Sequence, residues 1–233
     1  MESLSSSYRV LAPDSYSSGK SPRWEQDRDI TLRDEVELID SILDEAGDNF
    51  VLVGHSYGAA VALMAALIDP IRVRAIVVYE PTLFSLVDAK QPPPNGADGI
   101  RNAVSAAISA VDSGDNNTAA RYFIDYWTGV GSWDAIPESR KPAIAESVTN
   151  LAGWASALMN EPTPAEDFSA LKMPILYMLG KSSPESAHAV ADALMPNLPN
   201  AKRLELDGLG HMAPITHFRE VNAAIEDFLS QLE

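Results

Sequence analysis

The segment Gly54-His55-Ser56-Tyr57-Gly58 places a serine between two glycines, a spacing that can present a hydroxyl for nucleophilic attack. An apolar run at 50–53 precedes it and an alanine-rich stretch at 59–67 follows it. A strand that turns sharply into a helix holds such a serine on a strained turn, where flanking side chains would collide. The Ser56 hydroxyl and the Tyr57 N–H then face the same space. The sequence predicts that Ser56 is a nucleophile and that the Tyr57 N–H belongs to an oxyanion hole.

A serine hydroxyl is a poor nucleophile until a base takes its proton, so this motif requires a histidine elsewhere. His55 is too close to Ser56 in the chain to reach its hydroxyl in the usual geometry. His188 and His217 fall on helical segments that we expect to face solvent. His211 lies in a glycine-flanked loop after the last expected strand, where the strand ends converge. This position favours His211 as the base.

Short apolar runs alternate with helical patterns on both sides of the motif. Thr31 and Asp34 have the spacing of a capping box at the start of a helix, and a closing helix is expected at 218–232. Strands alternating with helices imply a mostly parallel sheet covered on both faces. The runs that we expect to form strands are 8–12, 50–53, 75–79, 174–179 and 203–206.

The character of the chain changes between residues 84 and 171. Helical patterns recur there and no convincing strand interrupts them. We expect a helical cap at 84–171, inserted into a core formed by 1–83 and 172–233. Three of the four tryptophans lie in this insertion, where they could line a substrate pocket or pack the cap onto the core: Trp127, Trp133 and Trp154.

The motif at Ser56, the strand ending at Gly180 and the segment Gly208-Leu209-Gly210-His211 together resemble the α/β-hydrolase superfamily. The likeness runs through nearly the whole chain and includes 8–14, which is similar to the strand and turn before the nucleophile strand. Residues 122–127 are similar to a group of small, uncharacterised members. The resemblance implies an α/β fold with helices on both faces of the sheet, an inserted helical cap, and the chain order serine, acid, histidine. It implies no metal and no organic cofactor.

The position of the acid departs from the usual pattern of the superfamily. That pattern places it in a Gly-x-x-Asp turn after the cap, but here the turn is Gly180-Lys181-Ser182-Ser183. Glu80 is the favoured candidate, because some members carry the acid at the end of this earlier strand and a carboxylate there can hold the imidazole N–H. Asp207, Glu185 and a dyad without an acid remain alternatives. Glu80 could instead cap the turn that enters the insertion.

The second donor of the oxyanion hole is the other departure. It normally comes from a His-Gly-type loop upstream of the strand expected at 8–12. Residues 1–7 are too short to supply it, and they resemble the tail of the helix that precedes that strand. We therefore expect the chain to be N-terminally truncated and to lack two or three strands. The expected cause is a start codon that lies upstream of Met1. As written, it would have an exposed sheet edge and half an oxyanion hole.

The formal net charge is −16, from 17 Lys and Arg against 33 Asp and Glu. Without a basic cluster, such a surface repels nucleic acids and anionic membranes. The sequence shows neither a bilayer-spanning apolar run nor a signal pattern, which indicates a cytoplasmic protein. The lack of cysteine excludes disulfides, thiolate metal sites and cysteine nucleophiles.

These observations predict a serine hydrolase that acts on a small, mainly apolar ester, lactone or related acyl compound. Ser56 would attack, His211 would relay the proton, Glu80 would orient His211 and the Tyr57 N–H would hold the oxyanion. The alternative is a non-catalytic binding protein on a hydrolase scaffold. The missing strands and the absent Gly-x-x-Asp acid favour that alternative, whereas the intact Ser56–His211 pair argues against it.

Overall fold

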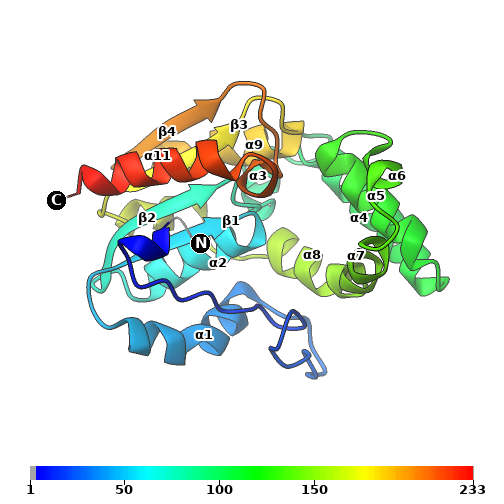
Figure 1. Cartoon of the computed structure of the whole chain (residues 1–233), viewed down its shortest axis with the longest axis horizontal. Helices are drawn as coiled ribbons and strands as arrows, with labels where there is room; N and C mark the ends of the chain where they lie inside the picture. Colours follow the sequence, from blue (N-terminus) through cyan, green and yellow to red (C-terminus); the bar gives the residue numbers. More distant parts are fainter. Residues whose placement is uncertain (1–3, 233) are drawn as a thin grey trace.

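The computed structural model describes residues 4–232 and is built on a parallel sheet. The sheet order is β1-β2-β3-β4, and every neighbouring pair is parallel. The register pairs the last residue of β1 with the last of β2, and the last of β3 with the last of β4. The carboxyl ends of the strands therefore share one edge (Figure 1). The strands are β1 (Phe50–His55), β2 (Val73–Tyr79), β3 (Ile175–Gly180) and β4 (Ala201–Leu206).

Helices cover both faces of this sheet, which confirms the predicted α/β arrangement. Ile76 and Val78 of β2 share one core cluster with α1 (Leu32–Ala46), α2 (Tyr57–Ile68) and α9 (Glu185–Leu194). The residues that alternate with them on β2 pack instead against α11 (Phe218–Ser230). The inner strands β2 and β3 are buried along almost their whole length, as expected for parallel strands with helices on both faces.

The starts of α1 and α2 follow from local sequence. Thr31 caps α1: its hydroxyl accepts from the Asp34 N–H, and the Asp34 carboxylate accepts from the Thr31 N–H at 2.8 Å. This is the predicted capping box. α2 is apolar all round and buried from Ala59 to Ala66, which places it in the core directly behind the Ser56 turn.

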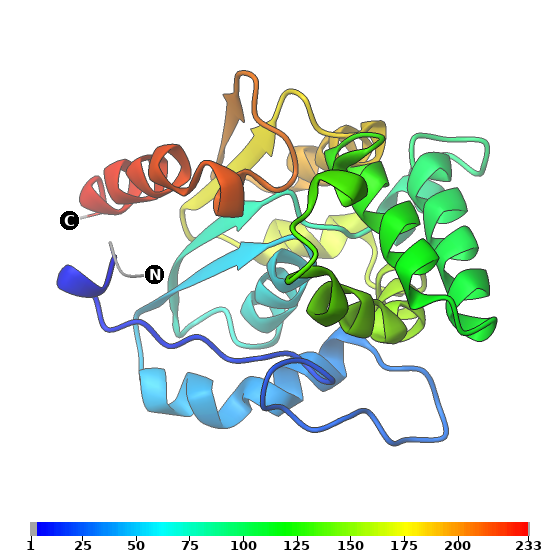
Figure 2. The ribbon, with the colours of Figure 1, turned by 45° about the vertical axis from the view of Figure 1, so that its right-hand side comes forward.

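Residues 84–171 contain helices and, within the part of the chain that the structure describes, no strand. The arrows of β1 and β2 point towards the helices of this insertion, which are drawn in green (Figure 2). The division into a core and a cap domain remains a prediction. The elements of the insertion are α3 (Ser85–Lys90), α4 (Asp98–Asp112), α5 (Asn116–Thr128), α6 (Ser132–Ala135), α7 (Lys141–Ser147), η2 (Val148–Asn150), α8 (Leu151–Met159) and η3 (Ala165–Ala170).

The remaining short elements flank the core strands and helices. They are η1 (Leu4–Ser6), η4 (Met195–Asn197) and α10 (Ala213–Thr216). The helix tail expected at residues 1–7 corresponds to the single turn η1 in its described part, and residues 1–3 lie outside the described residues.

The predicted strand at 8–12 is wrong. This segment has no regular secondary structure, and both Tyr8 and Val10 are exposed. A strand needs the N–H and C=O groups of a neighbouring strand, but within residues 4–232 the sheet consists of β1 to β4 only. A β-prone pattern without such a partner stays irregular. β1 is accordingly an edge strand of the described sheet, and its Val53 is 51% exposed.

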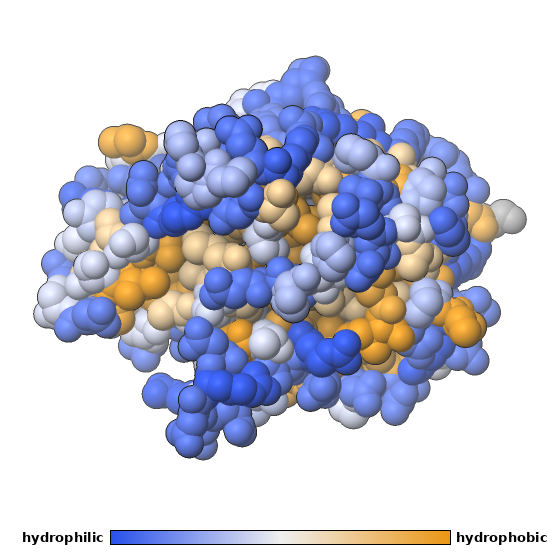
Figure 3. Space-filling view, turned by 180° about the vertical axis from the view of Figure 1, so that it is seen from behind, coloured by the Kyte–Doolittle hydropathy of each residue, from blue (hydrophilic) through white to orange (hydrophobic). Residues whose placement is uncertain are grey.

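The surface is rich in hydrophilic side chains, in keeping with the acidic composition. On the face seen in Figure 3, hydrophilic residues surround smaller hydrophobic areas. Among residues 4–232, no helix combines the length and the apolar character needed to cross a membrane.

Candidate active site

Ser56 occupies the predicted strand–turn–helix between β1 and α2. Its φ of 55° and ψ of −120° lie outside the usual regions for a residue with a side chain, a strain of about 1–3 kcal/mol. The Ser56 N–H donates to the Tyr79 carbonyl at 3.0 Å, which fixes the turn to the end of β2. A Cβ on Gly54 would lie 2.5 Å from the Cα of Ala59, so this position requires glycine.

The steric requirement does not extend to the second glycine of the motif. A Cβ on Gly58 would meet no atom within 4 Å, and Gly58 does not have a positive φ. The expectation that both flanking glycines avoid a collision is therefore correct for Gly54 and wrong for Gly58. The reason is that Gly58 lies on the exposed side of the first turn of α2.

His211 joins Ser56 to Glu80. Its Nε2 lies 2.9 Å from the Ser56 Oγ, and its Nδ1 lies 2.7 Å from the Glu80 Oε2. His211 is 2% exposed and Glu80 is fully buried. Because a carboxylate only accepts hydrogen bonds, Nδ1 carries the hydrogen and Nε2 is free to accept the Ser56 proton. The arrangement can activate a hydroxyl and stabilise the imidazolium that results.

Glu80 is held in place by neighbours on β3 and the loop after it. It follows β2 with a φ of 48°, a second strained residue at the strand ends. Its Oε1 accepts from the Gly180 N–H at 2.7 Å and from the Ser183 hydroxyl at 2.6 Å. Ser183 stands where the expected Gly-x-x-Asp turn would carry its acid. These donors, with the His211 N–H, provide the hydrogen bonds that a buried carboxylate requires.

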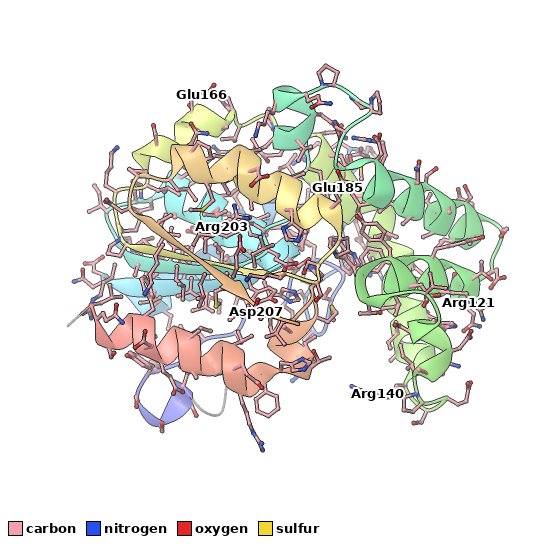
Figure 4. The ribbon with its side chains drawn as sticks, turned by 90° about the horizontal axis from the view of Figure 1, so that it is seen from above. Arg121, Arg140, Glu166, Glu185, Arg203 and Asp207 are labelled. Carbon is pink, nitrogen blue, oxygen red and sulfur yellow. The ribbon has the colours of Figure 1, made fainter. Side chains whose placement is uncertain are left out.

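The other two carboxylates considered as the acid lie elsewhere. Asp207 forms an ion pair with the Lys181 Nζ at 2.7 Å, and its side chain is 87% exposed. Glu185 is exposed at the start of α9, whereas Asp207 lies beyond the end of β4 (Figure 4). Both ring nitrogens of His211 already have partners in Ser56 and Glu80. The structure therefore brings Glu80, and neither alternative, to the imidazole.

Among residues 4–232, the ring nitrogens of the other histidines form no hydrogen bond with Ser56. His188 is partly buried on α9, and His217 is exposed just before α11. His55 donates from Nε2 to the His211 carbonyl at 2.8 Å. Burial, and secondarily the nearby His211 imidazole, lowers the pKa of His55 to about 3, so it is a neutral donor near neutral pH. Sequence reasoning assigned no such role to it, because the two residues are 156 positions apart.

Trp127 stacks on the imidazole of His211. The ring centroids are 3.7 Å apart and the planes differ by 22°. Trp127 comes from α5, so a side chain of the helical insertion packs directly on the imidazole of the site. From the sequence, each of the three tryptophans of the insertion could line a pocket or pack the cap onto the core, and nothing indicated which of them does which. In the structure Trp127 and Trp154 line a cavity, whereas Trp133 is buried beneath the Nζ of Lys141.

A cavity of about 60 Å³ opens at Ser56. Tyr57 lines it beside Ser56, and apolar side chains of α4, α5 and α8 form most of the remaining wall. Tyr57 is the first residue of α2, so its N–H has no acceptor within the helix and lies at the positive end of the helix dipole. A carbonyl oxygen on an acyl group bound at Ser56 can accept from this N–H.

Within the described residues 4–232, no group of three metal-ligating side chains gathers closely enough to hold a metal ion. The chemistry available at this site is that of a serine, an imidazole and a carboxylate, with one backbone donor beside the serine.

Comparison with known proteins places these features in a family. A model of the alpha/beta hydrolase family matches residues 1–224. Lipase LipV of Mycobacterium tuberculosis is 37% identical over 239 residues, covering 94% of this chain and 83% of that protein. Polyketide synthase ThaQ of Burkholderia thailandensis is 24% identical over 189 residues, covering 77% of this chain. The match covers only 8% of the length of that synthase.

Solved structures share the fold. A thermophilic esterase from Thermogutta terrifontis superposes with a TM-score of 0.74 at 20% identity, covering 99% of this chain and 83% of that one. At this identity the likeness concerns the arrangement of the elements and leaves the substrate open.

Proposed function

Because the chain belongs to the alpha/beta hydrolase family, we propose that it hydrolyses a small, mainly apolar ester, lactone or related acyl compound with Ser56 as its nucleophile. The relatives named as a lipase and an esterase support an esterase-like hydrolase. The observation that carries the proposal is the continuous contact from the Ser56 Oγ through the His211 imidazole to the buried Glu80 carboxylate.

The proposed reaction has two halves. The Ser56 Oγ attacks the acyl carbonyl carbon while the His211 Nε2 takes the serine proton, and the carbonyl oxygen becomes an oxyanion that accepts from the Tyr57 N–H. The C–O bond to the leaving group then breaks, and His211 returns the proton to the departing alcohol. Water repeats the sequence on the acyl-Ser56 ester, again with His211 as base, and releases the acid and free Ser56. Glu80 holds the Nδ1–H throughout.

The cavity supports a small acyl group. A dry cavity of about 150 Å³ accommodates benzene, so the volume of about 60 Å³ beside Ser56 suits an acyl chain of only a few carbons. Its lining offers Val104, Trp127, Trp154 and Leu158, which contact alkyl groups rather than charged ones.

Labelling with a fluorophosphonate tests the nucleophile. We expect covalent modification of Ser56 in the folded protein, no modification of a Ser56→Ala variant, and hydrolysis of p-nitrophenyl acetate in preference to the octanoate. Intact mass and peptide mapping identify the modified residue. If folded protein shows neither labelling nor hydrolysis, the hydrolase proposal is wrong.

A binding protein on the same scaffold is the competing function. It predicts that a small apolar ester binds, as measured by calorimetry, and is recovered unchanged. The intact geometry of Ser56, His211 and Glu80 favours turnover over this outcome.

A further inference from the structure

Glu35 is a buried carboxylate that the proposed mechanism does not use. It lies in the first turn of α1 and is 1% exposed. Its Oε1 accepts from the Tyr57 hydroxyl at 3.0 Å, and its Oε2 accepts from the Tyr16 N–H at 3.0 Å. Glu35 therefore connects α1, the loop before it and the residue that follows Ser56.

No cation compensates this carboxylate in the described contacts. The guanidinium of Arg28 pairs with the adjacent Asp34 at 2.6 Å. Burial raises the pKa of Glu35, although the hydrogen bonds from Tyr16 and Tyr57 oppose the rise. Burying a carboxyl group with no ion-pair partner is unfavourable, and only hydrogen bonds and the start of the α1 dipole offset it here.

Tyr57 is the residue on which Glu35 acts. Its hydroxyl is tied to Glu35, its ring lines the cavity, and its backbone N–H begins α2. Burial, followed by the charge of Glu35, raises the pKa of the Tyr57 hydroxyl, so it remains a donor. The ring also packs at an angle against Trp154 of α8, with centroids 6.0 Å apart. A shift of this ring would move both the cavity wall and the proposed oxyanion donor.

The loop on the other side of Glu35 is tied to the helical insertion. Tyr16 packs edge-on against Trp24, at 5.2 Å between centroids. The Asn150 side chain donates to the Ser17 carbonyl at 3.0 Å, and the Ser156 hydroxyl donates to Asp29 at 2.5 Å. Glu35 thus lies between the insertion-bound loop and the nucleophile turn.

We propose that Glu35 is a positioning residue. By anchoring the Tyr57 hydroxyl, it sets the orientation in which the Tyr57 N–H and ring meet the acyl group at Ser56. This inference rests on the proposed function, because it assumes that the Tyr57 N–H receives an oxyanion.

Three variants distinguish the effect of the hydrogen bond between Glu35 and the Tyr57 hydroxyl from the effect of the negative charge of Glu35. Glu35→Ala removes both hydrogen bonds, and Tyr57→Phe keeps the ring and the backbone but removes the anchored hydroxyl. Glu35→Gln keeps the shape: its amide oxygen can accept from the Tyr16 N–H while its NH₂ donates to the Tyr57 oxygen. Asp34→Asn is the matched control on the same turn of α1. It weakens the Thr31 cap and the Arg28 ion pair, and thus stability, without touching Tyr57.

The experiment measures kcat and KM for p-nitrophenyl acetate, the rate of fluorophosphonate labelling, and Tm. Removing an oxyanion donor lowers kcat by about 10²–10³, so displacing one should lower kcat by about 10-fold to 100-fold in Glu35→Ala and Tyr57→Phe. We expect Glu35→Gln to restore most of the kcat, and Asp34→Asn to lower Tm while leaving kcat unchanged. Labelling should slow in parallel with kcat.

Two failures are distinguishable. If the wild-type protein hydrolyses the ester, and Glu35→Ala and Tyr57→Phe keep its kcat while losing only Tm, Glu35 is a structural residue and the inference is wrong. If the wild-type protein itself neither hydrolyses the ester nor labels at Ser56, the proposed function fails, and the role assigned to Glu35 fails with it.

Discussion

The Glu80→Gln substitution replaces one carboxylate oxygen by an NH₂ group and keeps the shape of the side chain. In the protein, Oε1 accepts from the Gly180 N–H and the Ser183 hydroxyl, and Oε2 accepts from His211. The amide oxygen must therefore stay on the Gly180 side, because an NH₂ there would face a backbone donor. The NH₂ then points at the Nδ1 of His211 and forces the tautomer that carries its hydrogen on Nε2.

That tautomer cannot accept the Ser56 proton, and this sets the size of the effect. The corresponding Asp-to-Asn change in a Ser-His-Asp site lowers kcat by about 10⁴. This corresponds to roughly 5 kcal/mol at 1.36 kcal/mol for each factor of ten. We expect a loss of about 10³–10⁴ in kcat for Glu80→Gln, with little change in KM because Glu80 is not among the residues that line the cavity.

The assay is steady-state hydrolysis of p-nitrophenyl acetate, with Tm measured on each variant. Ser183→Ala removes one of the two donors to Oε1 and should lower kcat by at most about tenfold, the value of one hydrogen bond. Asp207→Asn alters an exposed ion pair and should leave kcat unchanged. Near wild-type turnover in Glu80→Gln, or a large loss in Asp207→Asn, would refute the reasoning.

Three further predictions follow from single contacts. Gly54→Ala places a methyl group against the backbone of α2 and should abolish labelling of the protein, whereas Gly58→Ala should keep kcat within about twofold; equal behaviour of the two would contradict the geometry. Trp127→Ala removes the ring stacked on His211 and should lower kcat by about tenfold or more, with Trp127→Phe intermediate; unchanged kcat in both would exclude this role. The pKa of His55 is about 3 in the folded protein and 6.5 without its surroundings, so the unfolded state binds more protons between these values and stability falls as pH drops through this window. Measured by urea unfolding from pH 4 to 7, the free energy of unfolding should depend less steeply on pH in His55→Gln than in the wild-type protein. Identical slopes for the two proteins would disprove the lowered pKa assigned to His55.

The parts of the fold that depend on local pattern were predictable. The apolar runs that form β1 to β4 and the capping box at Thr31 are contiguous in sequence, and the structure contains all of them. The segment 8–12 shows the limit of such patterns. Its residues suit a strand, but strand formation depends on a partner at another place in the chain, and propensity carries no information about that partner.

The residues of the site likewise differ in how far the sequence predicts them. The residues next to Ser56 predict it as the nucleophile, and the need for a base predicts His211, which lies after the last strand. The Trp127–His211 stack and the Glu35–Tyr57 hydrogen bond join segments that only the packed fold brings together. A buried glutamate on an otherwise amphipathic helix looks like an ordinary solvated charge in sequence, so nothing distinguished Glu35 from its exposed neighbours.

The position proposed for the acid is consistent with the geometry of the sheet. Neighbouring strands lie about 4.8 Å apart, so the ends of β2 and β3 are adjacent places from which a carboxylate can reach one imidazole. Glu80 follows β2, Ser183 lies just after β3, and their side chains are 2.6 Å apart. An aspartate at 183 beside Glu80 would place two carboxylates in contact, and their repulsion would raise the pKa of one of them. A serine there instead donates the hydrogen bond that the Glu80 carboxylate needs. We therefore propose that Ser183, in place of the Gly-x-x-Asp acid, complements Glu80 as the acid, and that this difference does not favour a scaffold that has lost its activity.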